Sequence, residues 1–168
     1  MKYHKELIFL LLALAIPNAN ADQKIAGSPI EHFTFEYDDS NWEARTDEKP
    51  ASYAIRNNAT GVVLAVAENK VSNKGAIAQK VLDEILARIS LDFKITKSTE
   101  EYGIGTPKGW TCQSFTTMHP VEKTTAKTKE CIFLGNGFRE RLTIIIPGSI
   151  DEASLIEINK VIDSLKNV

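Results

Sequence analysis

Two cysteines, each inside a stretch that favours a β-strand, most constrain how this chain can fold. Residues 108–118 (KGWTCQSFTTM) and 127–134 (KTKECIFL) are rich in Thr, Phe, Trp and Ile, which suit a pleated and half-buried surface. If the two stretches pair as one antiparallel hairpin, a single register sets Cys112 opposite Cys131. Directly opposed side chains have Cβ atoms about 4.5–5.5 Å apart, close enough for an S–S bond after a small adjustment. We therefore expect a Cys112–Cys131 disulfide.

The second of these stretches continues through residues 135–137 (GNG) into residues 138–146 (FRERLTIII). An Asn-Gly step between strand-like stretches predicts a type I′ turn, which needs positive φ at both central residues. The resulting register places alternate apolar residues of the last stretch on the face of Cys131, together with the acidic Glu140. Because both faces of the predicted sheet are partly apolar, we expect cover on both sides.

The remaining apolar periodicity predicts four more strands and two helices. Strands are expected over 32–37, 51–56, 61–68 and 92–97. A helix over 74–90, capped by Ser72 or Asn73, presents one apolar stripe, and a second helix follows a capping box formed by Ser149 and Glu152. The expected fold class is α+β, with an antiparallel sheet of about six to seven strands covered by two amphipathic helices.

The first 21 residues have the pattern of a cleaved signal peptide, so residues 22–168 are expected to form a single α+β domain. Lys2 and Lys5 precede an apolar stretch too short to span a bilayer, and Ala19-Asn20-Ala21 is typical of a cleavage site. We therefore expect a periplasmic or secreted protein without a stable membrane anchor, in an oxidising compartment. A formal net charge of −2 argues against a nucleic-acid partner.

The sequence contains no recognised catalytic or metal-binding motif. His32 and His119 are the two histidines beyond the leader, and they lie far apart in sequence. Neither a His-Glu-x-x-His pattern nor a strained Gly-x-Ser-x-Gly elbow is present, and a disulfide would remove both thiols as nucleophiles. From these patterns we expect no catalytic residue, metal or cofactor.

Exposed charged and aromatic side chains are the candidates for contact with a protein partner. The lysines and arginines also suit a solvated face, and the tryptophans also suit the core, where Trp110 would lie opposite Phe133. The candidate contact residues are Trp42, Trp110, His119, Lys123, Lys127, Arg139 and Arg141.

Three stretches resemble the PsbP-like fold, shared by photosystem accessory proteins and bacterial periplasmic proteins of the DcrB type. FTFEYDDSNWEA (33–44) is similar to its opening strand and turn. YAIRNNATGVVLAVAE (53–68), followed by AIAQKVLDEIL (76–86), is similar to its middle, and residues 139–166 are similar to its closing strand and helix. The resemblance implies an antiparallel sheet sandwiched by helices and an accessory or assembly role without catalysis. It carries over no functional residue.

Three functions are compatible with these observations. We favour an exported, non-enzymatic accessory or binding protein that acts through protein–protein contacts with an unidentified partner. One alternative is a small periplasmic hydrolase with a site assembled from loop carboxylates and His119. The other is a secreted inhibitor or effector that presents the loop 119–127. Fold alone does not decide among them.

Overall fold

A seven-stranded antiparallel sheet forms the centre of the protein, in the order β3-β4-β5-β9-β8-β7-β6. The structure is a computed structural model that describes residues 23–26, 32–45, 52–98 and 102–167, so the expected signal peptide lies outside the described residues. The strands of this sheet are β3 (Trp42–Arg45), β4 (Ser52–Asn57), β5 (Val63–Lys70), β6 (Lys94–Lys97), β7 (Thr111–Met118), β8 (Thr125–Leu134) and β9 (Phe138–Ile146). The expected fold class is confirmed.

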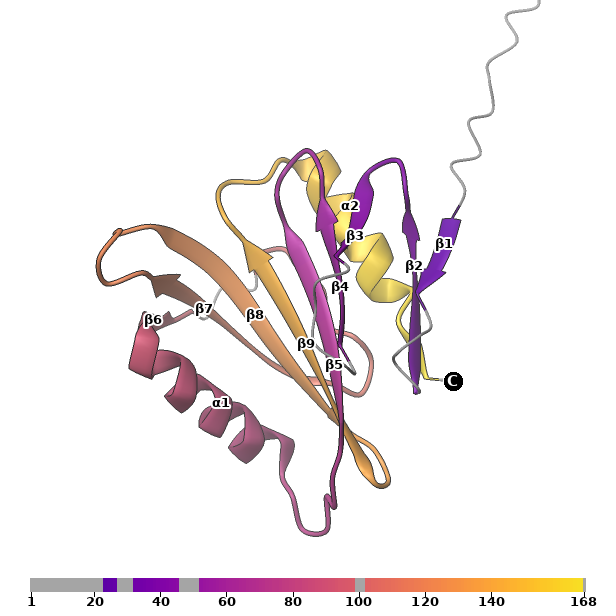
Figure 1. The fold of residues 1–168 in the computed structure, drawn as a ribbon, viewed down its shortest axis with the longest axis vertical. Helices are drawn as coiled ribbons and strands as arrows, with labels where there is room; N and C mark the ends of the chain where they lie inside the picture. The colour runs from indigo at the N-terminus through magenta and orange to yellow at the C-terminus, as the bar shows by residue number, and fades with distance from the viewer. Residues whose placement is uncertain (1–22, 27–31, 46–51, 99–101, 168) are drawn as a thin grey trace, which may run out of the picture.

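One face of the sheet is covered in part by α1 (Ala78–Asp92), which lies over β6, β7 and β8 (Figure 1). Val81 and Leu82 of the helix pack against Ile132 of β8. Successive residues of a strand point to opposite faces, so Ile132 and its neighbours on this face alternate with the residues of the main core.

The opposite face carries the main core and is covered by α2 (Glu152–Asp163) and β2 (Phe33–Asp38). Figure 1 shows both elements on the side of the sheet away from α1. Leu64 of β5, Leu142 of β9 and Ile158 of α2 are among its fully buried side chains. The prediction that the sheet is covered on both sides is thus confirmed.

A second, three-stranded sheet has the order β1-β2-β10 and was not expected from the sequence. β1 (Gln23–Ala26) and β10 (Lys166–Asn167) both pair antiparallel with β2. These short strands and β3 have too few residues to show a period-2 pattern, so a periodicity argument does not find them.

The cysteine register is confirmed: Cys112 lies opposite Cys131, and their sulfur atoms are 2.03 Å apart in a disulfide. The expected contact of Trp110 with Phe133 also forms, with ring centroids 5.8 Å apart. The expected type I′ turn after β8 is wrong, because positive φ occurs at Gly137 (87°) and not at Asn136. A positive φ at the second central residue alone is not the type I′ pattern.

Both expected helix caps are wrong. α1 begins after Ile77, without a side-chain cap, and Asn73 instead donates from Nδ2 to the carbonyl oxygen of Gly135 at 2.9 Å. α2 is capped by Asp151, whose Oδ1 accepts a hydrogen bond of 2.8 Å from the backbone N–H of Ser154. Neither helix of the described residues has the length and apolar character needed to cross a bilayer.

Candidate functional site

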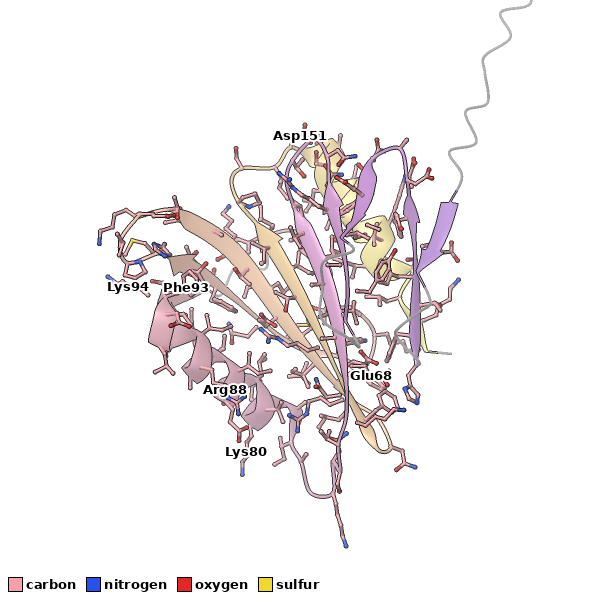
Figure 2. All side chains as sticks on the ribbon, viewed as in Figure 1. Glu68, Lys80, Arg88, Phe93, Lys94 and Asp151 are labelled. Carbon is pink, nitrogen blue, oxygen red and sulfur yellow. A yellow bond between two sulfur atoms is a disulfide. The ribbon has the colours of Figure 1, made fainter. Side chains whose placement is uncertain are left out.

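Two glutamates lie opposite each other on neighbouring central strands. The β5–β9 register pairs Glu68 with Glu140, and both residues point to the face of the main core. Figure 2 labels Glu68 on the side of the sheet away from α1. A carboxylate pair at directly opposed positions repels when both groups are ionised, so this arrangement needs a proton or a cation between the two groups.

His32, which directly precedes β2, completes the cluster. Its Nδ1 lies 2.9 Å from Oε2 of Glu68, and its backbone N–H donates to the same oxygen at 3.2 Å. Its ring stacks on Phe138 with centroids 3.7 Å apart and an interplanar angle of 8°. These contacts fix both the position and the plane of the imidazole.

The cluster is buried at its carboxylates and open at its histidine. Glu140 is 0 % exposed. The side chains of Glu68 and His32 are 4 % and 34 % exposed. Both carboxyl oxygens of Glu140 lack a hydrogen-bond donor among the described residues. Buried polar groups of native proteins are nearly always paired, so Glu140 calls for a specific explanation.

A shared proton is one such explanation. Burial, together with the hydrogen bond and charge of Glu68, raises the pKa of Glu140 to about 9. Burial also raises the pKa of Glu68, but hydrogen bonds with Glu140 and His32 outweigh it and leave that pKa below its usual value. At neutral pH the pair therefore holds one proton on Glu140 and one negative charge on Glu68.

The same three side chains have the donor set of a metal site. One ligand atom from each of His32, Glu68 and Glu140 lies within 4.8 Å of the other two. Imidazole nitrogen and carboxylate oxygen are ligands for zinc and other first-row transition metals. A neutral imidazole and two carboxylates balance the charge of a divalent ion, which removes the repulsion between the two glutamates.

The hydrolase alternative rests on a histidine that does not belong to this cluster. His119, the histidine of the hydrolase alternative, accepts a 3.1 Å hydrogen bond at Nδ1 from the backbone N–H of Glu122 and packs edge-on against Phe93. His119 and His32 lie on separate parts of the chain and are not brought into one site by any described contact.

The two tryptophans are core residues rather than contact surfaces. Trp42 is 1 % exposed and Trp110 is 7 % exposed. Trp110 packs edge-on against Phe33, with ring centroids 5.2 Å apart. Trp42 and Trp110 are therefore removed from the candidate partner contacts, because a buried ring offers no surface to a partner.

The predicted basic contact residues do not form one patch. Lys127 and Cys131 share the face of the main core, whereas Arg139 and Arg141 point to the α1 face. Lys127 is exposed and its Nζ lies 5.0 Å from the centre of the Tyr102 ring. Lys123 is exposed in the β7–β8 loop, where its Nζ donates to the carbonyl oxygen of Pro120 at 2.6 Å.

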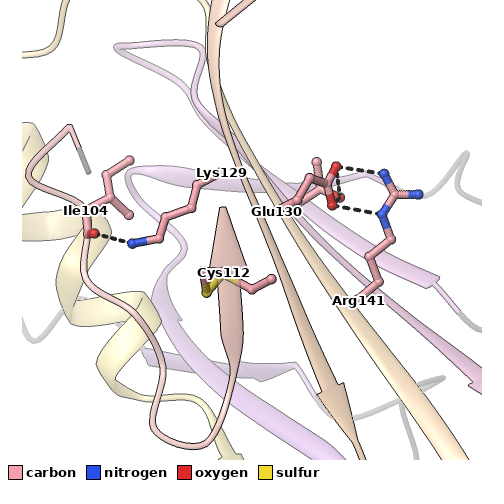
Figure 3. Close-up of a disulfide and its surroundings, with 7 residues drawn as sticks. Ile104, Cys112, Lys129, Glu130 and Arg141 are labelled. Carbon is pink, nitrogen blue, oxygen red and sulfur yellow. Dashed lines mark hydrogen bonds and ion pairs between the residues drawn. A yellow bond between two sulfur atoms is a disulfide. The ribbon is translucent and has the colours of Figure 1, made fainter. Parts of the chain in front are cut away.

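Arg141 is engaged within the protein. Its Nε and Nη2 donate to the buried carboxylate of Glu130 at 2.8 and 2.7 Å, and this hydrogen bonding raises the pKa of the arginine. Figure 3 shows this pair together with the disulfide and Lys129. Lys129 is 1 % exposed, and its Nζ donates to the carbonyl oxygen of Ile104 at 2.7 Å.

The disulfide does not lie at the base of the loop that the inhibitor alternative would present. Met118 and Thr125 form the last pair of the β7–β8 ladder before the loop, and Cys112 lies six positions back along β7 from Met118. The bridge therefore links the two strands at the end away from the loop. At the loop end the strands are joined by the backbone hydrogen bonds of the ladder.

Sequence reasoning missed the His32–Glu68–Glu140 cluster because its members are 36 and 72 positions apart along the chain. One signal was present: Glu140 falls on an otherwise apolar face of its strand. A charged residue at a core-facing position is rare unless it is paired, so that position is where a functional search starts.

Comparison with known proteins adds information on the fold. No family model and no curated protein matches the chain. A crystal structure of a protein from Bacteroides thetaiotaomicron is similar with a TM-score of 0.50 and 20 % identity, over 81 % of this chain and 45 % of that one. The chain thus spans about half the length of that protein. At this identity the likeness concerns the fold alone.

A second solved structure is LpqN, described as involved in cell envelope biogenesis of Mycobacterium tuberculosis. It is similar with a TM-score of 0.44 and 12 % identity, over 86 % of this chain and 90 % of that one. Neither of these two structures is described as a PsbP or DcrB protein.

Proposed function

We propose that this chain is an exported, non-enzymatic binding protein whose ligand is a divalent transition-metal ion, held by His32, Glu68 and Glu140. One observation carries the proposal: Glu140 is 0 % exposed, and no donor among the described residues reaches its two oxygens. Glu68 and His32 converge on the same point. A bound cation would take the place of the proton on Glu140 and give the buried carboxylate a positive partner, which it requires once it is ionised.

Charge and access also favour an ion over a larger ligand. The site supplies two potential negative charges and an imidazole nitrogen, and His32 is its most exposed member, with 34 % of its side chain accessible. Because Glu140 is protonated at neutral pH, binding must displace its proton. The protein is therefore expected to bind metal more tightly as the pH rises toward 9.

Export is supported by the leader pattern of residues 1–21 and by the Cys112–Cys131 disulfide, which persists in oxidising compartments. These features favour the cell envelope or the extracellular space, and the resemblance to PsbP-like and DcrB-type proteins favours the same location. Any protein partner would then receive or sense the ion. Among the predicted contact residues, Lys123 and Lys127 are the exposed ones at the β7–β8 loop end.

Isothermal titration of the purified protein with Zn²⁺ tests the proposal. We expect one ion per chain, with release of a proton that is measured by repeating the titration in buffers of different ionisation enthalpy. The association constant should rise by about tenfold per pH unit between about pH 6.5 and 8.5. Glu140→Gln, which keeps the size of the side chain but cannot ionise, should weaken binding by about 100-fold or more.

His119→Gln is the matched control for His32→Gln, because it removes the other histidine beyond the leader. The control should leave the affinity unchanged, whereas His32→Gln should lower it. Equal affinity in the wild-type protein and Glu140→Gln would show that the glutamate pair is only a proton-sharing contact of the core. Loss of binding in His119→Gln would place the ion elsewhere.

A further inference from the structure

A second candidate site lies on the α1 face of the sheet, opposite to the face of the metal cluster. It is a cavity between the C-terminal end of α1 and strands β7, β8 and β9 (Figure 1). Its volume is about 370 Å³. Ligand-binding cavities start at about 300 Å³, whereas one water molecule takes about 30 Å³ of the liquid. The residues that define its chemistry are Phe93, Phe115, Thr128, Glu130, Arg141 and Ile145.

Apolar side chains form most of the wall, and the cavity is open to solvent. Phe115 of β7 is fully buried. Phe93, directly after α1, and Ile145 of β9 are 37 % and 36 % exposed, so they form the rim. Large apolar side chains with this much exposure gain free energy when a ligand covers them. A molecule can therefore enter from solvent and bury apolar surface against the wall.

The charged groups of the cavity neutralise each other. Nε and Nη2 of Arg141 donate to the carboxylate of Glu130, and the hydroxyl of Thr143 donates to the same carboxylate (Figure 3). An ionised ligand would lose hydration on entry and would have to compete for a charge that is already paired. The cavity therefore favours a neutral molecule.

One hydroxyl group in the wall is available to a ligand. Thr128 lines the cavity and is 5 % exposed, and its hydroxyl has no hydrogen-bond partner among the described residues. That oxygen is not one of the unpartnered atoms that are sealed inside the protein, so it keeps accessible surface. A threonine hydroxyl can both donate and accept, so it suits a single hydroxyl group of a ligand.

We infer that this cavity binds a neutral, mainly apolar small molecule that carries one aromatic ring and one hydroxyl group. The ring packs against Phe93, Phe115 and Ile145, because aromatic rings gain free energy from contact with other rings beyond the area that they bury. The ligand hydroxyl forms a hydrogen bond with the hydroxyl of Thr128. Simple phenols have this chemistry.

Nuclear magnetic resonance of protein labelled at the isoleucine methyl groups tests the inference. Titration with p-cresol should shift the signals of Ile89 and Ile145, which line the cavity, and leave Ile158 of the main core in place. Ile89→Val and Ile145→Val assign the two signals. A ligand of this size is expected to bind with a Kd on the order of 0.1–1 mM. The titrations are made in excess chelator, so they do not depend on whether the His32 cluster holds a metal.

Thr128→Val should weaken p-cresol binding by about fivefold, since it removes one hydrogen bond and keeps the shape of the side chain. It should not change the affinity for p-xylene, in which a methyl group replaces the hydroxyl group. Thr117→Val is the matched control, because Thr117 also lines the cavity but its hydroxyl already donates to the carbonyl oxygen of Ala126 at 3.3 Å.

Ala126→Phe adds a ring at a partly exposed position in the wall and should abolish binding of both p-cresol and p-xylene. Tighter binding of the anion p-toluate than of p-cresol would overturn the neutral ligand class. An equal effect of Thr128→Val on p-cresol and p-xylene would overturn the role of the hydroxyl. Absence of any shift of Ile89 and Ile145 at about 5 mM p-cresol would show that the cavity holds only water.

Discussion

At the residue scale, Glu140 is the most unusual side chain of the described structure. It is fully buried on the central strand β9, and its pKa is raised to about 9 by burial and by Glu68. An acid with a raised pKa stays protonated in the folded chain and releases its proton when the chain unfolds. Its contribution to stability is therefore largest at low pH and is lost as the pH rises.

This contribution gives a prediction for the metal-free protein, kept in excess chelator. Between about pH 4.5 and 9 the folded state binds one more proton than the unfolded state at Glu140, so the free energy of unfolding falls by up to about 1.4 kcal/mol per pH unit. Glu140→Gln carries no titrating group, and its urea-unfolding free energy should depend less on pH over this window.

The lowered pKa of Glu68 acts at the acid end of the range. That contribution is present above the unfolded pKa of about 4.3 and is lost as the pH falls through the lower folded value.

The control for Glu140→Gln is Glu122→Gln, in the exposed β7–β8 loop, which should follow the wild-type pH profile. An identical pH slope in wild type and Glu140→Gln would contradict the buried shared proton.

At the element scale, the start of α2 is capped by a different residue from the one that the sequence pattern predicts. Ser149 has the sequence pattern of a capping box, but Asp151 makes the hydrogen bond to the N–H of Ser154. That hydrogen bond also lowers the pKa of Asp151. A carboxylate at a helix N-terminus satisfies a free N–H group and meets the positive end of the helix dipole.

Asp151→Ala should therefore lower the Tm by about 2–4 °C at neutral pH, as measured by circular dichroism. The difference should vanish at low pH, because the stabilisation from a carboxylate with a lowered pKa is lost as the pH falls through that pKa. Ser149→Ala should leave the Tm unchanged. A larger loss from Ser149→Ala than from Asp151→Ala would restore the cap expected from the sequence.

At the scale of the whole molecule, the disulfide ties two neighbouring strands of the sheet. Cys112 and Cys131 are separated by 19 positions, and Cys131 is fully buried. In the chain-entropy model, closing a loop of about 20 residues restricts the unfolded chain and stabilises the fold by roughly 3 kcal/mol.

Replacing both cysteines with serine should lower the free energy of unfolding by about 3 kcal/mol, as measured in urea. Wild-type protein that is kept reduced should have the same urea midpoint of unfolding as the double variant. Two free thiols in unreduced, denatured wild-type protein would contradict the bridge. Zn²⁺ binding by the folded double variant should be retained, because neither sulfur belongs to the His32 cluster.

How much of the fold could be predicted depended on how far apart the interacting residues lie along the sequence. The hairpin register followed from Cys112 and Cys131, because both cysteines lie in strands joined by one loop. The helix starts did not follow, because Ser72, Asn73 and Ser149 all suit a cap locally, and tertiary contacts decided which groups were used. Asn73, for example, bonds to the β8–β9 turn instead.

The candidate site could not be derived in the same way. Glu68 and Glu140 meet because β5 pairs with β9 across the intervening helix and hairpin, and His32 joins them because β2 crosses the far side of the core. A single chain's periodicity predicts which face a residue takes, but not which strands become neighbours.

The sequence by itself determined the alternation of apolar and polar residues along the strands, the two amphipathic helices and the pairing of the cysteines, because each rests on a local pattern. The tertiary structure decided the strand order of the sheet, the burial of Trp42 and Lys129, and the convergence of one histidine and two glutamates. Those properties depend on contacts between distant segments, whose free energy is gained only when the whole core assembles.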